Sequence, residues 1–159
     1  MTGNHPMHML LTSNRRTTDL LEREIGESVK IKVVNQFYNL DKESHTLRLI
    51  RESVTISPNQ TSMVAHNYVC INPSFIPKSV YYSMIQKQSG IGHYLRENQI
   101  KANRVIIEYG IINTSSIPYQ HKLRITGKLI PYKRYQLTFL GSSQPGFNIT
   151  EYFHPNLFK

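Results

Sequence analysis

The strongest constraint on the fold is the number of short segments with strand-like patterns. In these segments apolar residues alternate with polar ones, or β-branched and aromatic residues run together between turn formers. The candidates are residues 29–33, 47–56, 63–71, 104–112, 123–130, 135–140 and 147–153. Only three segments, residues 18–25, 80–88 and 92–95, indicate helices.

This balance decides the fold class. A parallel sheet needs a crossover, usually helical, between its strands, and three short helices cannot provide enough of them. We therefore predict an α+β fold, with a single antiparallel sheet of about six strands and a few helices packed on it. The 159 residues show no internal repeat and no linker, so we expect one domain over residues 1–159.

Two of these elements carry more detailed predictions. For the helix at residues 18–25, Thr18 and Asp19 are suitable N-caps, and Gly26 provides a C-terminal stop. For the strand at residues 104–112, the spacing predicts a shared face for Val105, Ile107, Tyr109 and Ile111.

Composition narrows the cellular setting. Cys70 is the only cysteine, so an intrachain disulfide is excluded and no oxidising compartment is needed. The N-terminal region has no signal-peptide pattern, and no run approaches the roughly 20 apolar residues of a membrane span. We therefore expect a cytoplasmic protein without membrane contact.

The formal net charge of +9 attracts anions of many kinds and does not by itself choose among them. The tightest basic groups are Arg15 with Arg16, Lys30 with Lys32, and Lys133 with Arg134. No nucleic-acid motif accompanies the charge, and the interleaved segment at residues 132–135 is the only hint of one. We expect no nucleic-acid partner.

A metal or cofactor site is not indicated. The seven histidines never fall at a paired ligand spacing such as His-x-x-x-His, and there is no second cysteine. The pair Gly90 and Gly92 is too short a signal for a phosphate loop. We predict no bound metal and no cofactor.

Arg51 is the first candidate for binding chemistry. In an alternating strand it shares a face with Leu49 and Ser53, and a cation on a partly apolar face needs an anionic partner. A guanidinium binds a carboxylate through two parallel hydrogen bonds, so a carboxylate ligand suits it. From the residues alone, an ion pair with Glu52 or Glu108 is the commoner explanation.

Glu151 is the second candidate. It alternates onto a face with Phe147, Ile149 and Phe153, and apolar surroundings would raise its pKa and let it act as an acid near neutral pH. From the residues alone, a carboxylate that faces water at the strand edge is the commoner explanation.

Four segments, in this order along nearly the whole chain, resemble the chorismate pyruvate-lyase family. They are residues 10–13 with 17–22 (LLTS, TTDLLE), residues 49–52 (LIRE), residues 91–95 with 104–110 (IGHYL, RVIIEYG) and residues 150–155 (TEYFHP). Each segment is short, and the resemblance lies in their shared order and spacing. The divergent branch with archaeal and mycobacterial members is the most similar.

The chain departs from the family at two points. Thr17 stands where the better-known bacterial enzymes have a methionine in the pocket wall. Residues 112–135 are longer than the bacterial pattern, and two alignments compete there. Either residues 122–124 (KLR) or residues 134–136 (RYQ) match the family's basic strand.

The resemblance implies a carbon–oxygen lyase that converts chorismate to 4-hydroxybenzoate and pyruvate without a cofactor. Arg51 and the backbone N–H of Ile91 would hold the ring carboxylate, Gly92 would allow close approach, and Thr17 would line the pocket. Glu151 would bond the ring hydroxyl or protonate the departing oxygen. Aromatisation drives the elimination, so the protein need only position the substrate and stabilise charge.

Two alternatives remain open. The first is a non-catalytic small-molecule-binding domain of the same fold, as bacterial regulators use to sense ligands. The second is a basic nucleic-acid-binding domain. In the main interpretation the partner is the small anion chorismate, and the protein is a monomer or a homodimer.

Overall fold

The computed structural model describes residues 5–59, 62–86, 90–118 and 121–158. Within these ranges six strands form one antiparallel sheet in the order β1-β2-β3-β6-β5-β4. The strands are β1 Lys30–Asp41, β2 Thr46–Ser57, β3 Ser62–Ile71, β4 Ala102–Asn113, β5 Leu129–Phe139 and β6 Phe147–Phe153. The helices are α1 His5–Thr12, α2 Thr17–Ile25, α3 Lys78–Gln86 and α4 Ile91–Glu97.

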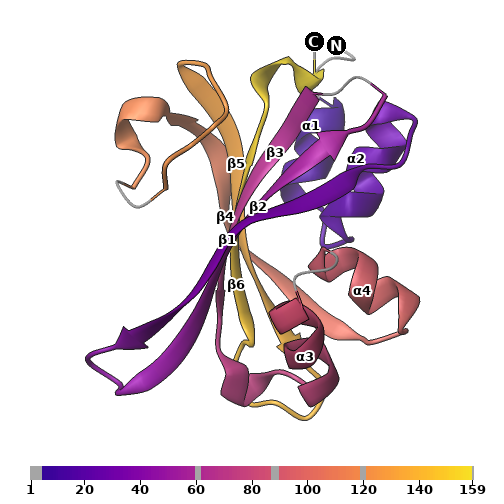
Figure 1. Ribbon diagram of the computed structural model, residues 1–159. Coiled ribbons are helices and arrows are strands. Elements are labelled where there is room, and N and C mark those ends of the chain that lie inside the picture. Colours follow the sequence, from indigo (N-terminus) through magenta and orange to yellow (C-terminus); the bar gives the residue numbers. More distant parts are fainter. Residues whose placement is uncertain (1–4, 60–61, 87–89, 119–120, 159) are drawn as a thin grey trace.

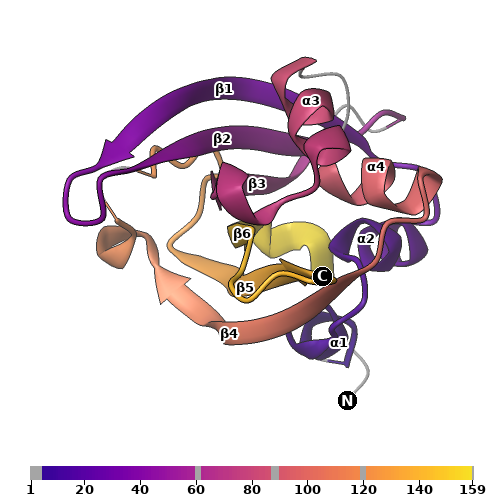
Figure 2. The same cartoon turned by 90° about the horizontal axis from the view of Figure 1, so that it is seen from below.

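The helices all pack on one face of the sheet, called here the inner face (Figure 1). The sheet curls, so that β1 and β2 lie opposite β4 and β5 with β6 between them (Figure 2). The segment that joins β4 to β5 lies on the other side, called the outer face. The predicted α+β fold with an antiparallel sheet is confirmed.

Two apolar clusters join the helices to the inner face. One packs α3 and α4 on the sheet through residues such as Val80, Leu95 and Phe147. The other packs α1 and α2 through residues such as Leu21 and Phe153. A third and smaller cluster packs Ile117, Leu123, Ile125 and Ile130 against the outer face.

The predicted strand at residues 123–130 is wrong, since residues 121–128 belong to no strand and β5 begins at Leu129. Ile125 is buried in the third cluster. The backbone N–H of Arg124 donates to His66 Nδ1 at 3.0 Å. Because a side chain satisfies this backbone group, the segment can cross the outer face without joining the sheet.

The shared face predicted for residues 105–111 is also wrong. The register between β4 and β5 shifts between Ile106 and Glu108. Val105 then pairs with Gln136 and Tyr109 with Lys133, two residues that point to opposite faces of β5. A bulge adds one residue, and this reverses the face of everything beyond it.

The helix predicted at residues 18–25 is present as α2, and it begins one residue earlier. Its N-cap is Arg16, without a side-chain cap, so the predicted caps Thr18 and Asp19 lie inside the first turn. Gly26 ends the helix at φ +82°, a conformation that glycine adopts without strain.

Candidate functional site

A cavity lies between the inner face of the sheet and the wall formed by α2 and α4. We call it the inner cavity, and its volume is about 60 Å³. Its polar lining comes from α2, from strands β2 to β6 and from the start of α4. It consists of Arg16, Thr17, Thr18, Ser53, Thr55, Asn67, Arg51, Arg104, Tyr135 and Glu151, together with the backbone of residues 90–92.

The structure brings all five predicted site residues to this cavity. Thr17 comes from α2, Arg51 from β2, Ile91 and Gly92 from α4, and Glu151 from β6. The first and last of them, Thr17 and Glu151, are 134 positions apart along the chain. Their roles in binding or catalysis stay predictions.

Arg51 lies at the floor of the inner cavity and is 1% exposed. Its Nη1 is 2.8 Å from the Sδ of Met84 on α3. Burial lowers the pKa of Arg51 to about 10, so the guanidinium still carries its charge at neutral pH.

Glu151 lines the same cavity from β6 and is also buried. Thr17 Oγ1 donates a 2.8 Å hydrogen bond to its Oε1. Lys133, its cross-strand neighbour on β5, donates from Nζ to the Leu10 carbonyl at 2.8 Å. Glu151 is therefore buried among polar groups as well as apolar ones.

Sequence reasoning missed a hydrogen-bonded group on the cavity floor. Asn67 on β3 donates from Nδ2 to Ser53 Oγ at 3.3 Å and to Thr55 Oγ1 at 3.1 Å. Asn67 Oδ1 is buried without a hydrogen-bond partner among the described residues. Ser53 and Thr55 follow Arg51 at period two, and this spacing was the available signal.

Arg104 on β4 is the other missed residue. Its guanidinium stacks over the Tyr135 ring, 5.0 Å from the ring centroid. Its Nε and Nη1 are buried and have no hydrogen-bond partner in the part of the chain that the structure describes. Arg104 belongs to one of the segments that resemble the family, but the resemblance assigned no function to its side chain.

Of the two segments that compete for the family's basic strand, only one lies in a strand of this sheet. Residues 134–136 lie in β5, and Tyr135 lines the cavity. Residues 122–124 lie in no strand. The second of the two alternatives therefore corresponds to the strand of the sheet.

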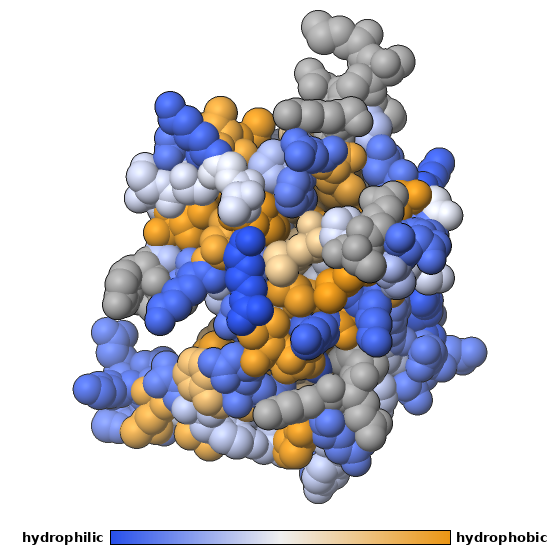
Figure 3. Space-filling model, turned by 45° about the horizontal axis from the view of Figure 1, so that its top comes forward, coloured by the Kyte–Doolittle hydropathy of each residue, from blue (hydrophilic) through white to orange (hydrophobic). Residues whose placement is uncertain are grey.

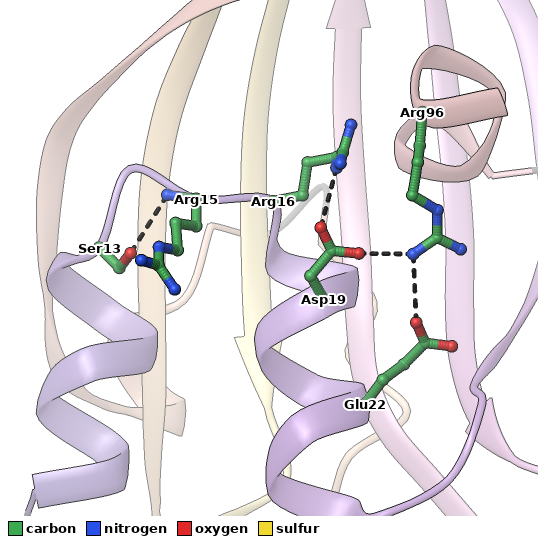
Figure 4. Close-up of polar contacts among 6 residues, drawn as sticks. All are labelled: Ser13, Arg15, Arg16, Asp19, Glu22 and Arg96. Carbon is green, nitrogen blue, oxygen red and sulfur yellow. Dashed lines mark hydrogen bonds and ion pairs between the residues drawn. The ribbon is translucent and has the colours of Figure 1, made fainter. Parts of the chain in front are cut away.

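Ion pairs hold α2 against α4 at the rim of the cavity (Figure 4). Asp19 accepts from Arg16 Nε at 2.9 Å and from Arg96 Nη1 at 2.6 Å, and Arg96 also reaches Glu22 at 3.4 Å. Partial burial acts to raise the pKa of Asp19, but Arg16 and Arg96 together lower it. The wall is thus fixed by charge as well as by packing.

The inner cavity adjoins a second and more open space of about 300 Å³. Arg16, Arg104 and Leu137 line both. The second space adds the basic side chain of Lys101. A ligand larger than the inner cavity would therefore extend past Arg104 into another basic region.

Neither metal binding nor membrane spanning has structural support in the described ranges. No group of three or more His, Cys, Asp or Glu side chains there is suited to a metal ion. No helix in those ranges is long and apolar enough to cross a bilayer.

No family model matches the sequence, and no curated protein matches it significantly. Solved structures do match. The effector domain of PhnF from Mycobacterium smegmatis aligns with a TM-score of 0.59 and 9% identity over 92% of each chain. A GntR-family transcriptional regulator from Bacillus cereus aligns with a TM-score of 0.57 and 12% identity, covering 82% of this chain and 94% of that one.

A third match is the ligand-binding domain of a putative GntR-family regulator from Bordetella bronchiseptica. It has a TM-score of 0.52 and 5% identity, and covers 80% of this chain and 86% of that one. The chain has a chorismate lyase-like fold. At these identities the likeness shows the fold alone, and no sequence comparison names a lyase.

Proposed function

We propose that this chain is a ligand-binding domain that takes a small organic anion, such as a carboxylate, into the inner cavity. The observation that carries the proposal is the charge of the lining. Three arginines, Arg16, Arg51 and Arg104, line it against one carboxylate, Glu151. Arg51 is buried and Arg16 and Arg104 are partly buried, and guanidinium groups in such surroundings favour anions because burial weakens screening by water and salt.

Arg104 makes the case more specific. Two of its guanidinium nitrogens, Nε and Nη1, are buried and have no hydrogen-bond partner among the described residues. Leaving such charged donors unsatisfied is costly, and a carboxylate matches the guanidinium with two parallel bonds. A ligand in the inner cavity would supply that partner.

The cavity floor limits the rest of the ligand. The Ser53 and Thr55 hydroxyls accept from Asn67, so each still has its own O–H to donate. Asn67 Oδ1 and Glu151 are acceptors. The best match is an anion that also carries a hydroxyl or amino group.

The structural neighbours support this class of function. One of them is the effector domain of PhnF, and another is the ligand-binding domain of a putative GntR-family transcriptional regulator. We propose the same kind of role here, in which a partner module or partner chain responds to the binding of the ligand.

Calorimetric titration of the chain with benzoate, 4-hydroxybenzoate, pyruvate and phosphate tests the proposal. At least one carboxylate is expected to bind. Arg104→Ala should weaken it by roughly tenfold or more, since a hydrogen bond to a charged group contributes about 1.5–3 kcal/mol. Arg15→Ala removes the same charge outside the lining and should leave affinity unchanged. Equal losses in both variants, or no binding by any carboxylate, would refute the proposal.

A second candidate is the chorismate pyruvate-lyase activity that the resemblance implies. It is favoured by the convergence of Thr17, Arg51, Ile91, Gly92 and Glu151 on one cavity. Incubation with chorismate and chromatography of the products tests it. Formation of 4-hydroxybenzoate and pyruvate, abolished in Arg51→Ala, would make the chain an enzyme, and absence of both products would leave the binding domain.

A further inference from the structure

The outer face carries a groove that shares no polar residue with the inner cavity. Its volume is about 510 Å³, within the range of small-molecule sites. We call it the outer groove. In Figure 3 the surface is hollowed on the left, between the segment that follows β4 above and the β1–β2 hairpin below.

The floor of the groove consists of two rows of paired residues that cross four neighbouring strands. The strand register places each row on one line across the sheet. The polar row is Asn35, Glu52, Tyr68 and Thr150. The second row is Phe37, Ile50, Cys70 and Asn148.

The wall of the groove is held in place by ring contacts. His121 stacks on Tyr68, with centroids 4.1 Å apart and planes at 8°. His121 Nδ1 is also 2.7 Å from the Tyr152 hydroxyl. Residues 121–122 are thereby fixed beside the floor, and the groove is a built feature of the fold.

Polar groups on the floor are positioned and offer both donors and acceptors. His66 accepts from the Arg124 backbone at Nδ1, so its Nε2 carries the hydrogen that binds Glu52 Oε2 at 2.6 Å. Gln136 donates to Asn148 Oδ1 at 2.9 Å, which leaves the Asn148 amide N–H₂ as a donor. The buried Tyr68 hydroxyl beside Glu52 lacks a partner of good geometry among the described residues.

We propose that the outer groove binds a neutral polyhydroxylated ring of the size of a sugar. Asparagine, threonine and glutamate side chains suit ligand hydroxyls, which both donate and accept. Phe37 and Ile50 of the second row offer an apolar surface for the carbon face of a ring. Glu52 and Lys122 balance in charge, so the groove, unlike the inner cavity, does not select an anion.

Cys70 allows a direct test, because it is the only cysteine of the chain and lies on the groove floor. Its alkylation by iodoacetamide is followed by mass spectrometry with glucose, galactose, mannose, ribose or arabinose present. At ten times its Kd a bound sugar leaves about one site in ten open, so labelling should slow roughly tenfold. Sodium benzoate should not slow it.

Substitutions test whether the sugar protects Cys70 by binding in the outer groove. Asn148→Ala and Thr150→Val should each remove the protection. Asn103→Ala, an exposed asparagine of β4 outside the groove, should retain it, as should Arg51→Ala in the inner cavity. If Cys70 does not react in the folded protein, calorimetry on wild type and Asn148→Ala replaces labelling. Failure of all five sugars, or protection by benzoate instead, would overturn the proposal and leave the anion site untouched.

Discussion

At the residue scale, the inner cavity is built around guanidinium groups more than around its carboxylate. Arg51 enters from β2 and Arg104 from β4, with the Tyr135 ring beneath Arg104. Arginine keeps its charge when buried, and its fork of donors fixes the orientation of a carboxylate. Substitutions at Arg51 and Arg104 can therefore distinguish the contribution of charge to anion binding from that of hydrogen-bond geometry.

Arg51→Ala should bind the carboxylate that calorimetry identifies roughly thirty to several thousand times more weakly, because loss of one charged partner typically costs about 2–5 kcal/mol. Arg51→Lys should recover little, since an ammonium keeps the charge but loses the two-pronged geometry. Circular dichroism and melting must show that both variants are folded. Wild-type affinity in folded Arg51→Ala would contradict this assignment.

Glu151→Gln distinguishes the two candidate functions. In a binding domain it should strengthen the binding of benzoate, which has no hydroxyl for Glu151 to accept, by up to about tenfold, because it removes a negative charge from the cavity. In a lyase it should instead lower kcat with little change in KM, because an amide is a poor proton donor. Titration and product assays on the same preparation decide between them, and an unchanged affinity together with an unchanged kcat would argue against any role for Glu151.

At the element scale, α2 and α4 matter because they close the cavity. The ion pairs between them are partly exposed, with side chains of Asp19 and Arg96 at 37% and 40%. Each such pair contributes only about 0–1 kcal/mol, so the pairs position the helices and stabilise the fold little. Close packing of the α4 start against β1 contributes more to its placement.

Gly90→Ala should disturb this placement. A Cβ at Gly90 would meet Ile31 Cγ1 at 2.5 Å and Ile31 Cβ at 3.0 Å, so β1 or α4 must move. We expect a loss of about 1–3 kcal/mol in urea unfolding, as for other overpacked sites, and weaker anion binding. Gly92→Ala is the matched control, because its Cβ meets only the Thr18 side chain at 3.0 Å. Equal stability of the two variants would show that the contact is unimportant.

At the scale of the whole molecule, one sheet separates the inner cavity from the outer groove, whose linings differ in chemistry, and a buried lysine lies on its inner side. Lys133 is fully buried near Glu151 and Arg104. Burial lowers the pKa of Lys133 to about 8. Its charge therefore opposes folding at neutral pH and links global stability to pH.

The free energy of unfolding should rise between pH 8 and 10 in wild type relative to Lys133→Met. In this range the unfolded chain binds a proton that folded Lys133 has released, so raising the pH favours the fold. The difference approaches roughly 3 kcal/mol at the upper end, since each pKa unit corresponds to about 1.4 kcal/mol. Urea unfolding of both proteins at several pH values measures it, and parallel curves would mean that Lys133 titrates normally.

The sequence determined the features that depend on local chemistry. Alternation set the α+β class, and the predicted strand at residues 147–153 coincides with β6. Gly26 ended α2 because few other residues adopt its conformation without strain. The resemblance selected five residues that the fold brings to one cavity. It did not decide the function, since at these identities the structural neighbours show the fold alone.

Only the tertiary structure decided what depends on register and distant partners. The bulge in β4 redirected an apolar face, and residues 121–128 crossed the outer face because His66 bonds their backbone. The stacking of Arg104 on Tyr135 and the rows of the outer groove each join strands far apart in the chain. A local pattern fixes which way a side chain alternates, but strand pairing fixes which residues it meets, and those partners give each site its charge and shape.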